Sequence, residues 1–415
     1  MKLGGKNMSK EDISGYKKKF DEDVTSFNDY EATDYVKTLK QSGDLDEAIE
    51  VGSTFYSMCP HLRGYINQYG YALYNKYINK QPEVIEENEF LFFSFAKDIL
   101  NMCKQEKYSP YEATVYRMIR YITSKDEIDY KDYEEKLRLL DPKLLSNEPL
   151  FSRDGKIENE SPLERWYRQM VKVLYEQKRY KECITYANNA LASIHKFHRR
   201  NLQNIQYMRA LSYIALEDYD NGQRDLLALQ GQMRDVNLYE TLYKIYASKN
   251  EDHLANAYLL YDLYQSGYDT SKKELFQHLL DASTKANYKA LSDLVTLFIQ
   301  KVEVEEGTRT QIENDPHPNE DSGIIYDRMM EELTNHLDKL VEREQGKVTY
   351  YNQEKLLGNI RTPQDTSIFF RQADYIYDEE VERRDEVSYT VLPSYDRKKD
   401  TLTNRAVLIL LEYND

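Results

Sequence analysis

Residues 346–360 read Gly-Lys-Val-Thr-Tyr-Tyr-Asn-Gln-Glu-Lys-Leu-Leu-Gly-Asn-Ile, and residues 365–371 read Asp-Thr-Ser-Ile-Phe-Phe-Arg. In this part of the chain the hydrophobic period is two, which indicates β-strands. Further strand-like runs follow at 386–392 and 405–410. Five short strands in about seventy residues suit a small closed barrel. We therefore predict a five-stranded antiparallel β-barrel over residues 344–415.

Upstream of the barrel the hydrophobic period changes to 3.6. Apolar residues recur at helical spacing between about residues 28 and 302, while Gly and Pro cluster at the joints. The fold class is therefore mainly α, a solenoid of helix hairpins followed by the barrel. The predicted segments before the barrel are an N-terminal helical lobe at 1–146, a loop at 147–162, a helical array at 163–303, an acidic flexible linker at 304–323 and a connecting helix at 324–343.

Four segments of the helical part have the pattern helix, turn, helix, with small residues early in the second helix. In the first, Ala48 is followed twelve residues later by Pro60. A small residue lets two helices approach closely, and Pro ends the second one. The corresponding small residues of the later segments are Cys183 and Ala187, Gly222, and Ala255.

These segments resemble tetratricopeptide repeats, which are helical hairpins of about 34 residues. A generic α-solenoid is the alternative. The resemblance implies that the array binds a protein partner, and we expect its concave, Tyr-rich face to do so because tyrosine suits interfaces as well as packing. The sequence does not identify this partner.

The C-terminal strands resemble a cold-shock domain, a small OB-type barrel, over about a sixth of the chain. Residues 346–348 match the family's opening Gly-Lys-Val, and residues 350–352 stand where the family has Trp-Phe-Asn. Residues 355–360 stand where its first ribonucleoprotein motif reads Lys-Gly-Phe-Gly-Phe-Ile, and residues 368–372 where its second reads Val-Phe-Val-His-Phe. The resemblance implies binding of RNA or single-stranded DNA on exposed aromatic side chains.

Carried over residue by residue, the resemblance names five candidate nucleic-acid-binding residues: Lys347, Tyr350, Lys355, Phe369 and Arg371. Three aromatic positions of the family are replaced, by Leu357, Asn359 and Gln372. Each lost base–aromatic stack weakens binding by about 1–3 kcal/mol. Two interpretations therefore stay open: a barrel that binds RNA or single-stranded DNA, and a barrel kept as a structural or protein-docking module.

Composition limits the function further. The formal net charge of −16 argues against a general nucleic-acid coat, although a local basic groove remains compatible with it. Residues 397–399, Arg-Lys-Lys, are predicted to lie in a long loop between the last two strands. No stretch approaches the ~20 apolar residues that cross a bilayer, and the first residues lack the apolar core of a signal peptide. We expect a cytoplasmic protein that does not bind membranes.

The sequence offers no pattern typical of catalysis, and we predict no catalytic residue, metal or cofactor. Cys59, Cys103 and Cys183 lie far apart, and we expect buried thiols. His195 and His198 are one helical turn apart and could share a metal, but a solvated helix end is favoured because no third ligand has a recognisable spacing.

The chain thus resembles bacterial-type proteins that join a tetratricopeptide-like array to a cold-shock-like barrel. Its predicted role is a non-enzymatic adaptor or regulator, with a protein on the array and RNA or single-stranded DNA on the barrel. The alternatives are a pure protein–protein scaffold and an enzyme whose site lies in residues 60–150, the segment that fits the repeat pattern least well.

Overall fold

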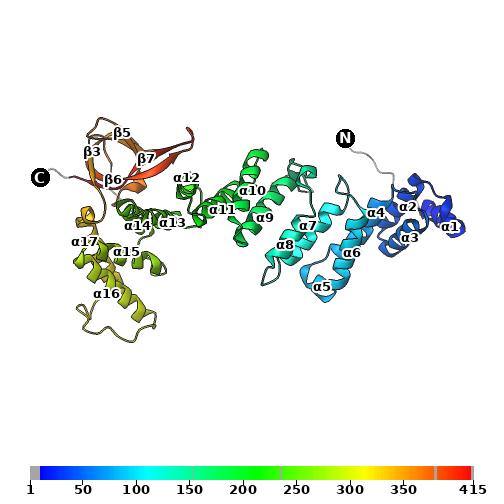
Figure 1. The fold of residues 1–415 in the computed structure, drawn as a ribbon, viewed down its shortest axis with the longest axis horizontal. Helices are drawn as coiled ribbons and strands as arrows, with labels where there is room; N and C mark the ends of the chain where they lie inside the picture. The colour runs from blue at the N-terminus through cyan, green and yellow to red at the C-terminus, as the bar shows by residue number, and fades with distance from the viewer. Residues whose placement is uncertain (1–9, 153, 234–235, 378–380, 413–415) are drawn as a thin grey trace. The chain divides into compact units, whose positions relative to one another are not determined.

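The protein is described here by a computed structural model, which covers residues 10–152, 154–233, 236–377 and 381–412. These residues form seventeen α-helices and seven strands, and the last five strands close a barrel (Figure 1). The predicted fold class, mainly α with a small C-terminal β-barrel, is confirmed. The chain divides into two compact units, residues 1–208 and 209–415, and the boundary falls within helix α11.

The first unit is built of successive helices, with one long connection between α8 and α9. One hydrophobic core surrounds Tyr35 and Phe55, and a second extends from Leu73 to Ile205 around Trp166. The helices of this unit are α1 (Lys10–Glu22), α2 (Asp29–Ser42), α3 (Leu45–Met58), α4 (Ile66–Leu73), α5 (Pro82–Glu87), α6 (Glu89–Met102), α7 (Tyr111–Ile122), α8 (Tyr130–Leu137), α9 (Pro162–Glu176), α10 (Tyr180–Ser193) and the first half of α11 (Asn201–Ala215).

The first predicted hairpin shows how the sequence sets these helices. Asn28 begins α2 with a capping box, in which its side chain and that of Glu31 bond reciprocally to each other's backbone amides. Gly43, at φ 94°, ends α2 in the left-handed conformation that glycine tolerates. Ala48 is fully buried in α3, which ends two residues before Pro60. Helix pairs are also present at the other three predicted turns.

The segment predicted as a loop at 147–162 contains a small β-hairpin. Strands β1 (Leu150–Phe151) and β2 (Glu158–Asn159) pair antiparallel. Gly155 provides a turn residue at φ 72° between them. The pairing covers two residues per strand, which is too short for a period-two pattern to reveal.

The second unit begins with helices and ends with the barrel. Its helices are the rest of α11, α12 (Tyr219–Leu229), α13 (Leu238–Ser248), α14 (Asp252–Ser266), α15 (Lys273–Lys285), α16 (Lys289–Glu305) and α17 (Ser322–Asn335).

The predicted linker and connecting helix fall at the end of this helical part. The segment between α16 and α17 is tied to α16 by an ion pair of 2.6 Å between Lys301 and Asp315. Helix α17 ends at Asn335, several residues before the predicted end, and His336 leaves the helical conformation at φ −137°. Thr334, Asn335 and His336 are all weak helix formers, which favours this early end.

The barrel strands are β3 (Glu344–Asn352), β4 (Leu357–Arg361), β5 (Ser367–Arg371), β6 (Glu386–Asp396) and β7 (Thr401–Leu411). They close in the order β3-β4-β5-β7-β6. Neighbouring strands pair antiparallel except β5 and β7, which pair parallel through Phe369 and Arg405. Val348, Ile360 and Phe370 lie in the barrel core, fully or almost fully buried.

Gly358 of β4 lies close to the backbone of β3. A Cβ atom on Gly358 would lie 2.4 Å from the carbonyl oxygen of Tyr350 and 2.5 Å from the ring of Phe370. Since backbone cannot move aside as a flexible side chain can, we expect Gly358→Ala to destabilise the second unit by about 1–3 kcal/mol. Urea unfolding followed by circular dichroism measures this loss. Gly15→Ala, in exposed α1 with no atom within 4 Å of the new Cβ, is the control that should not destabilise.

Candidate nucleic-acid interface

The predicted aromatic pair lies in one row across the outer face of the barrel. Tyr350 of β3 pairs with Asn359 of β4, which pairs with Phe369 of β5. Strand β3 has a β-bulge, because the register with β4 shifts between Val348 and Tyr350. The bulge turns the Tyr350 side chain outward. Tyr350 is 49% exposed and Phe369 is half-buried. The structure therefore brings these two rings to the same face, with an amide between them where the cold-shock pattern has a phenylalanine.

The neighbouring aromatics serve the core instead. Tyr351 faces inward and stacks on Phe370, with the two rings 6.1 Å apart and 2° from parallel. The Tyr351 hydroxyl donates to Gln372 Oε1 at 2.7 Å. These rings are unavailable to a base, which leaves Tyr350 and Phe369 as the predicted stacking residues.

The predicted cations occupy exposed positions on β3, on β5 and in the turn between β3 and β4. Lys347 lies on the outer face of β3, opposite Arg361, and its ammonium is 3.3 Å from Glu386. Lys355 lies in the β3–β4 turn, and Arg371 ends β5. An exposed ion pair such as that of Lys347 contributes about 0–1 kcal/mol, so a phosphate can compete for the lysine.

The basic run 397–399 does not lie in a long loop, which corrects the prediction. Strands β6 and β7 extend to Asp396 and from Thr401, so the run sits in the tight turn of a long hairpin. Arg397 donates to the carbonyl oxygens of Ala228, at 3.2 Å, and Gln230, at the end of α12. Burial, followed by the nearby Arg371, lowers the pKa of Arg397. Arg397 thus fixes the hairpin to the helices of this unit.

The opposite side of the barrel is covered by helix α14. The Tyr258 hydroxyl donates to the Pro393 carbonyl oxygen at 2.9 Å, and the Tyr261 hydroxyl donates to Asp374 Oδ1 at 2.8 Å. Arg405 is 2% exposed, 3.7 Å from Asp374, with its guanidinium over the Tyr261 ring. The outer face of β7 is therefore closed around Arg405, whereas residues 401–404 of β7 are exposed. The face formed by β3, β4 and β5 remains accessible within this unit.

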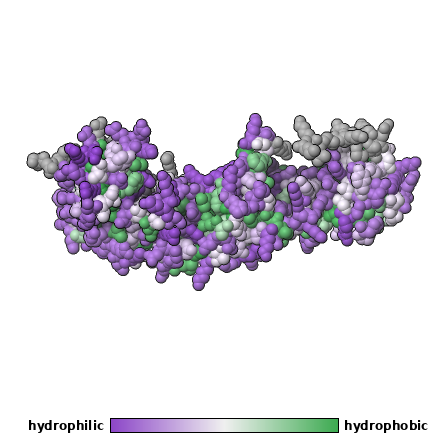
Figure 2. All heavy atoms as spheres, turned by 90° about the horizontal axis from the view of Figure 1, so that it is seen from above, coloured by the Kyte–Doolittle hydropathy of each residue, from purple (hydrophilic) through white to green (hydrophobic). Residues whose placement is uncertain are grey.

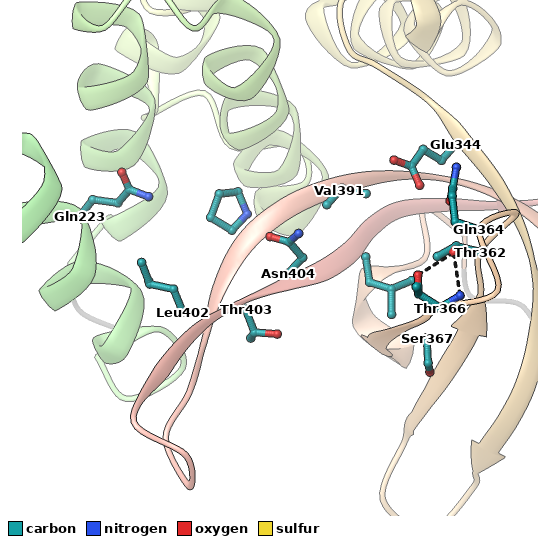
Figure 3. Close-up of a pocket in the computed structure, with 12 residues that line it drawn as sticks. Gln223, Glu344, Thr362, Gln364, Thr366, Ser367, Val391, Leu402, Thr403 and Asn404 are labelled. Atoms are coloured by element: carbon teal, nitrogen blue, oxygen red, sulfur yellow. Dashed lines mark hydrogen bonds between the residues drawn. The ribbon is translucent and has the colours of Figure 1, made fainter.

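A pocket of about 660 Å³ opens at the end of the barrel where β5 and β7 separate. Figure 3 shows the β6–β7 hairpin on one side of it and the β4–β5 loop on the other. Most of the lining groups are uncharged amides and hydroxyls. No sequence pattern predicts them, because they come from distant segments. They include Gln223, Gln364, Thr366, Ser367, Thr403 and Asn404, together with the carboxylate of Glu344.

His198 is not part of a solvated helix end, which corrects the expectation from sequence. It is 9% exposed, and its ring nitrogens lie 2.6 Å from Glu164 Oε2 and 3.0 Å from Glu158 Oε1. Asn201 and the His198 backbone amide donate to the other oxygen of Glu164. His195 stays exposed. This buried network joins the β1–β2 hairpin to α9.

The His198 network gives the first unit a pH-dependent stability. Burial alone would lower the pKa of His198, but the bonds to Glu158 and Glu164 outweigh it and raise that pKa above 6.5. The stabilisation is therefore complete below about pH 6.5 and is lost as the pH rises through the raised value. We expect the free energy of unfolding to fall over that range when urea unfolding is followed by the fluorescence of Trp166, the single tryptophan. His198→Gln should flatten the profile, whereas His195→Gln should leave it unchanged.

One group of possible metal ligands occurs among the described residues. Ligand atoms of Glu240, Glu274 and His278 all lie within 4.8 Å of one another. The Lys244 ammonium lies 2.5 Å from Glu240 and 3.5 Å from Glu274. The lysine already supplies the positive charge between the carboxylates, so we assign no function to this group.

The first unit exposes an apolar patch with an acidic rim. Phe90 is 83% exposed, Val84 47% and Leu91 44%. Around them, α5 and the start of α6 carry Glu83, Glu86, Glu87 and Glu89, of which Glu89 pairs with Lys125 at 2.9 Å. Exposed apolar side chains gathered within a polar rim are typical of protein-binding surfaces.

Comparisons with known proteins add no relative. No protein-family model matches the chain, and no curated protein matches it.

Hydrophilic residues cover most of the face shown in Figure 2, in keeping with the mean hydropathy of −0.78. In the part of the chain that the structure describes, every helix is too short or too polar to span a bilayer. All three cysteines are buried thiols, as predicted.

Proposed function

We propose that this protein is a non-enzymatic adaptor whose C-terminal barrel binds single-stranded RNA or DNA and whose helical array binds a protein. The observation that carries the proposal is the row Tyr350–Asn359–Phe369 on the accessible face of the barrel. The two rings lie on β3 and β5, on either side of β4, and each can stack a base without regard to sequence. Lys347, Lys355 and Arg371 lie around the row as phosphate-binding groups.

The topology supports an OB-type, cold-shock-like interpretation of the barrel. A five-stranded Greek-key barrel is the architecture of OB folds, whose second and third strands and adjoining loops bind oligonucleotides. Here the second and third strands are β4 and β5, and β5 carries Phe369. The helix pairs at the four predicted turns likewise support a tetratricopeptide-like array.

Fluorescence anisotropy of the full chain with a labelled eight-nucleotide RNA, at several salt concentrations, tests the proposal. Neutralising Z phosphates gives a slope of log K against log salt of about −0.7Z for a single strand. With three available cations we expect a slope of roughly −2. No binding at low salt would refute nucleic-acid binding by this barrel.

A second candidate function, a pure protein–protein scaffold, is favoured by the patch of Val84, Phe90 and Leu91. Its acidic rim suits a partner with apolar anchors flanked by Lys or Arg, because opposite charges speed and orient association. The RNA measurement separates the two functions, since a scaffold whose barrel serves only for packing gives no salt-dependent RNA binding.

A further inference from the structure

The pocket at the end of the barrel continues the aromatic row. Ser367, on its rim, lies two residues before Phe369 on β5, so both side chains point to the same side of the strand, about 7 Å apart. A single strand whose base stacks on Phe369 therefore brings a neighbouring base to the pocket. In the described strands, the pairing of β5 with β7 is at Phe369 and Arg405. The two described strands are unpaired before that point, so the entrance to the pocket is open.

Three polar groups of this pocket are available to a ligand. Gln364 and Asn404 are exposed, and the side-chain amide of neither makes a hydrogen bond to another described residue. Glu344 is exposed and has no ion-pair partner among the described residues, and one of its oxygens accepts from the Tyr389 hydroxyl at 3.0 Å. A carboxylate only accepts hydrogen bonds, whereas each side-chain amide both donates and accepts them.

We propose that this pocket reads one base and prefers a base with an exocyclic amino group, cytosine or adenine, over uracil. The inference rests on the proposed function. Glu344 can accept from the cytosine N4 amino group, as carboxylates do in base recognition. Uracil presents a carbonyl oxygen at the same position, which the carboxylate repels. Asn404 and Gln364 can complete the contact by donating to a ring nitrogen or carbonyl.

The test compares r(C)8 with r(U)8 on the full chain by fluorescence anisotropy, because two pyrimidines stack on the aromatic row almost alike. We expect r(C)8 to bind roughly tenfold more tightly. Glu344→Gln keeps an acceptor for Tyr389 but adds a donor, so it should reduce or reverse the preference. Asn404→Ala should reduce it, whereas Gln277→Ala, an exposed amide on α15, should not.

The outcomes separate this inference from the function on which it rests. Equal binding of both oligonucleotides, or a preference that survives Glu344→Gln, would overturn base reading in this pocket while leaving RNA binding by the barrel intact. Absence of binding to either oligonucleotide at low salt would overturn both.

Discussion

Replacing both rings of the aromatic row, Tyr350→Ala with Phe369→Ala, is expected to lower the affinity for single-stranded RNA by at least about 30-fold. Each base–aromatic stack contributes about 1–3 kcal/mol, so the pair contributes about 2–6 kcal/mol, and 1.4 kcal/mol is a factor of ten. Because Tyr350 is 49% exposed and Phe369 lies half-buried on the same outer face, truncation should affect stability less than binding. Fluorescence anisotropy with r(C)8 measures the loss.

The matched control removes two other exposed rings. Tyr30 and Tyr108 are each 76% exposed and lie in the first unit. Tyr30→Ala with Tyr108→Ala should leave RNA affinity within twofold of the unsubstituted chain. If both double variants bind alike, the barrel does not use this face, and the scaffold interpretation gains support. The salt slope should stay unchanged in the ring variant, since stacking residues release no counterions.

The barrel could be predicted from sequence because its information is local. Alternation along 346–351 and 367–371, with turn residues between, indicates strands without knowledge of the rest of the chain. The outward position of Tyr350 follows from the resemblance to the cold-shock pattern, whereas the inward position of Tyr351 is seen only in the structure. The parallel pair of Phe369 with Arg405 joins residues far apart in the chain, and neither segment has a sequence pattern that predicts this pairing.

Long-range contacts also explain the predictions that were wrong. His198 reads as part of a basic, solvated segment, yet its partners Glu158 and Glu164 lie 40 and 34 residues earlier in the chain. Arg397 looks like a phosphate ligand in a loop, but it bonds to carbonyl groups 169 and 167 residues away. In each case the local sequence shows the charge, and only the fold shows the group that neutralises or binds it.

The pocket beside Phe369 could not be predicted from the sequence, because it too depends on residues far apart in the chain. Gln223, Glu344, Gln364 and Asn404 are ordinary surface residues in sequence, and they come from four separate elements or loops. A site of this kind has no spacing that a sequence pattern could reveal, unlike a metal motif or a phosphate-binding loop. Tyrosine, the most abundant aromatic, contributes to the cores of both units, since Tyr35, Tyr65, Tyr246, Tyr258 and Tyr389 are all fully or almost fully buried.

Asp374→Ala is expected to destabilise the second unit by about 3–5 kcal/mol, because it leaves Arg405 as a buried charge without its partner. Asp374 is 1% exposed, and it also accepts from the Tyr261 hydroxyl at 2.8 Å and the Arg371 backbone amide at 2.7 Å. Urea unfolding followed by circular dichroism, with hydrogen exchange of β7 peptides, should report the loss. The Trp166 transition in the first unit should not move.

Companion variants show whether the loss comes from the unpaired charge or from the missing hydrogen bonds. Asp374→Asn keeps an acceptor for the Arg371 amide but removes the charge, so an unpaired Arg405 should still cost most of the stability. Asp374→Leu combined with Arg405→Met removes both charges, and replacing a buried ion pair by apolar residues is often neutral or stabilising. We therefore expect the double variant to recover much of the lost stability. If it is as unstable as Asp374→Ala, the hydrogen bonds from Tyr261 and Arg371, rather than the charge of Arg405, hold the barrel against α14.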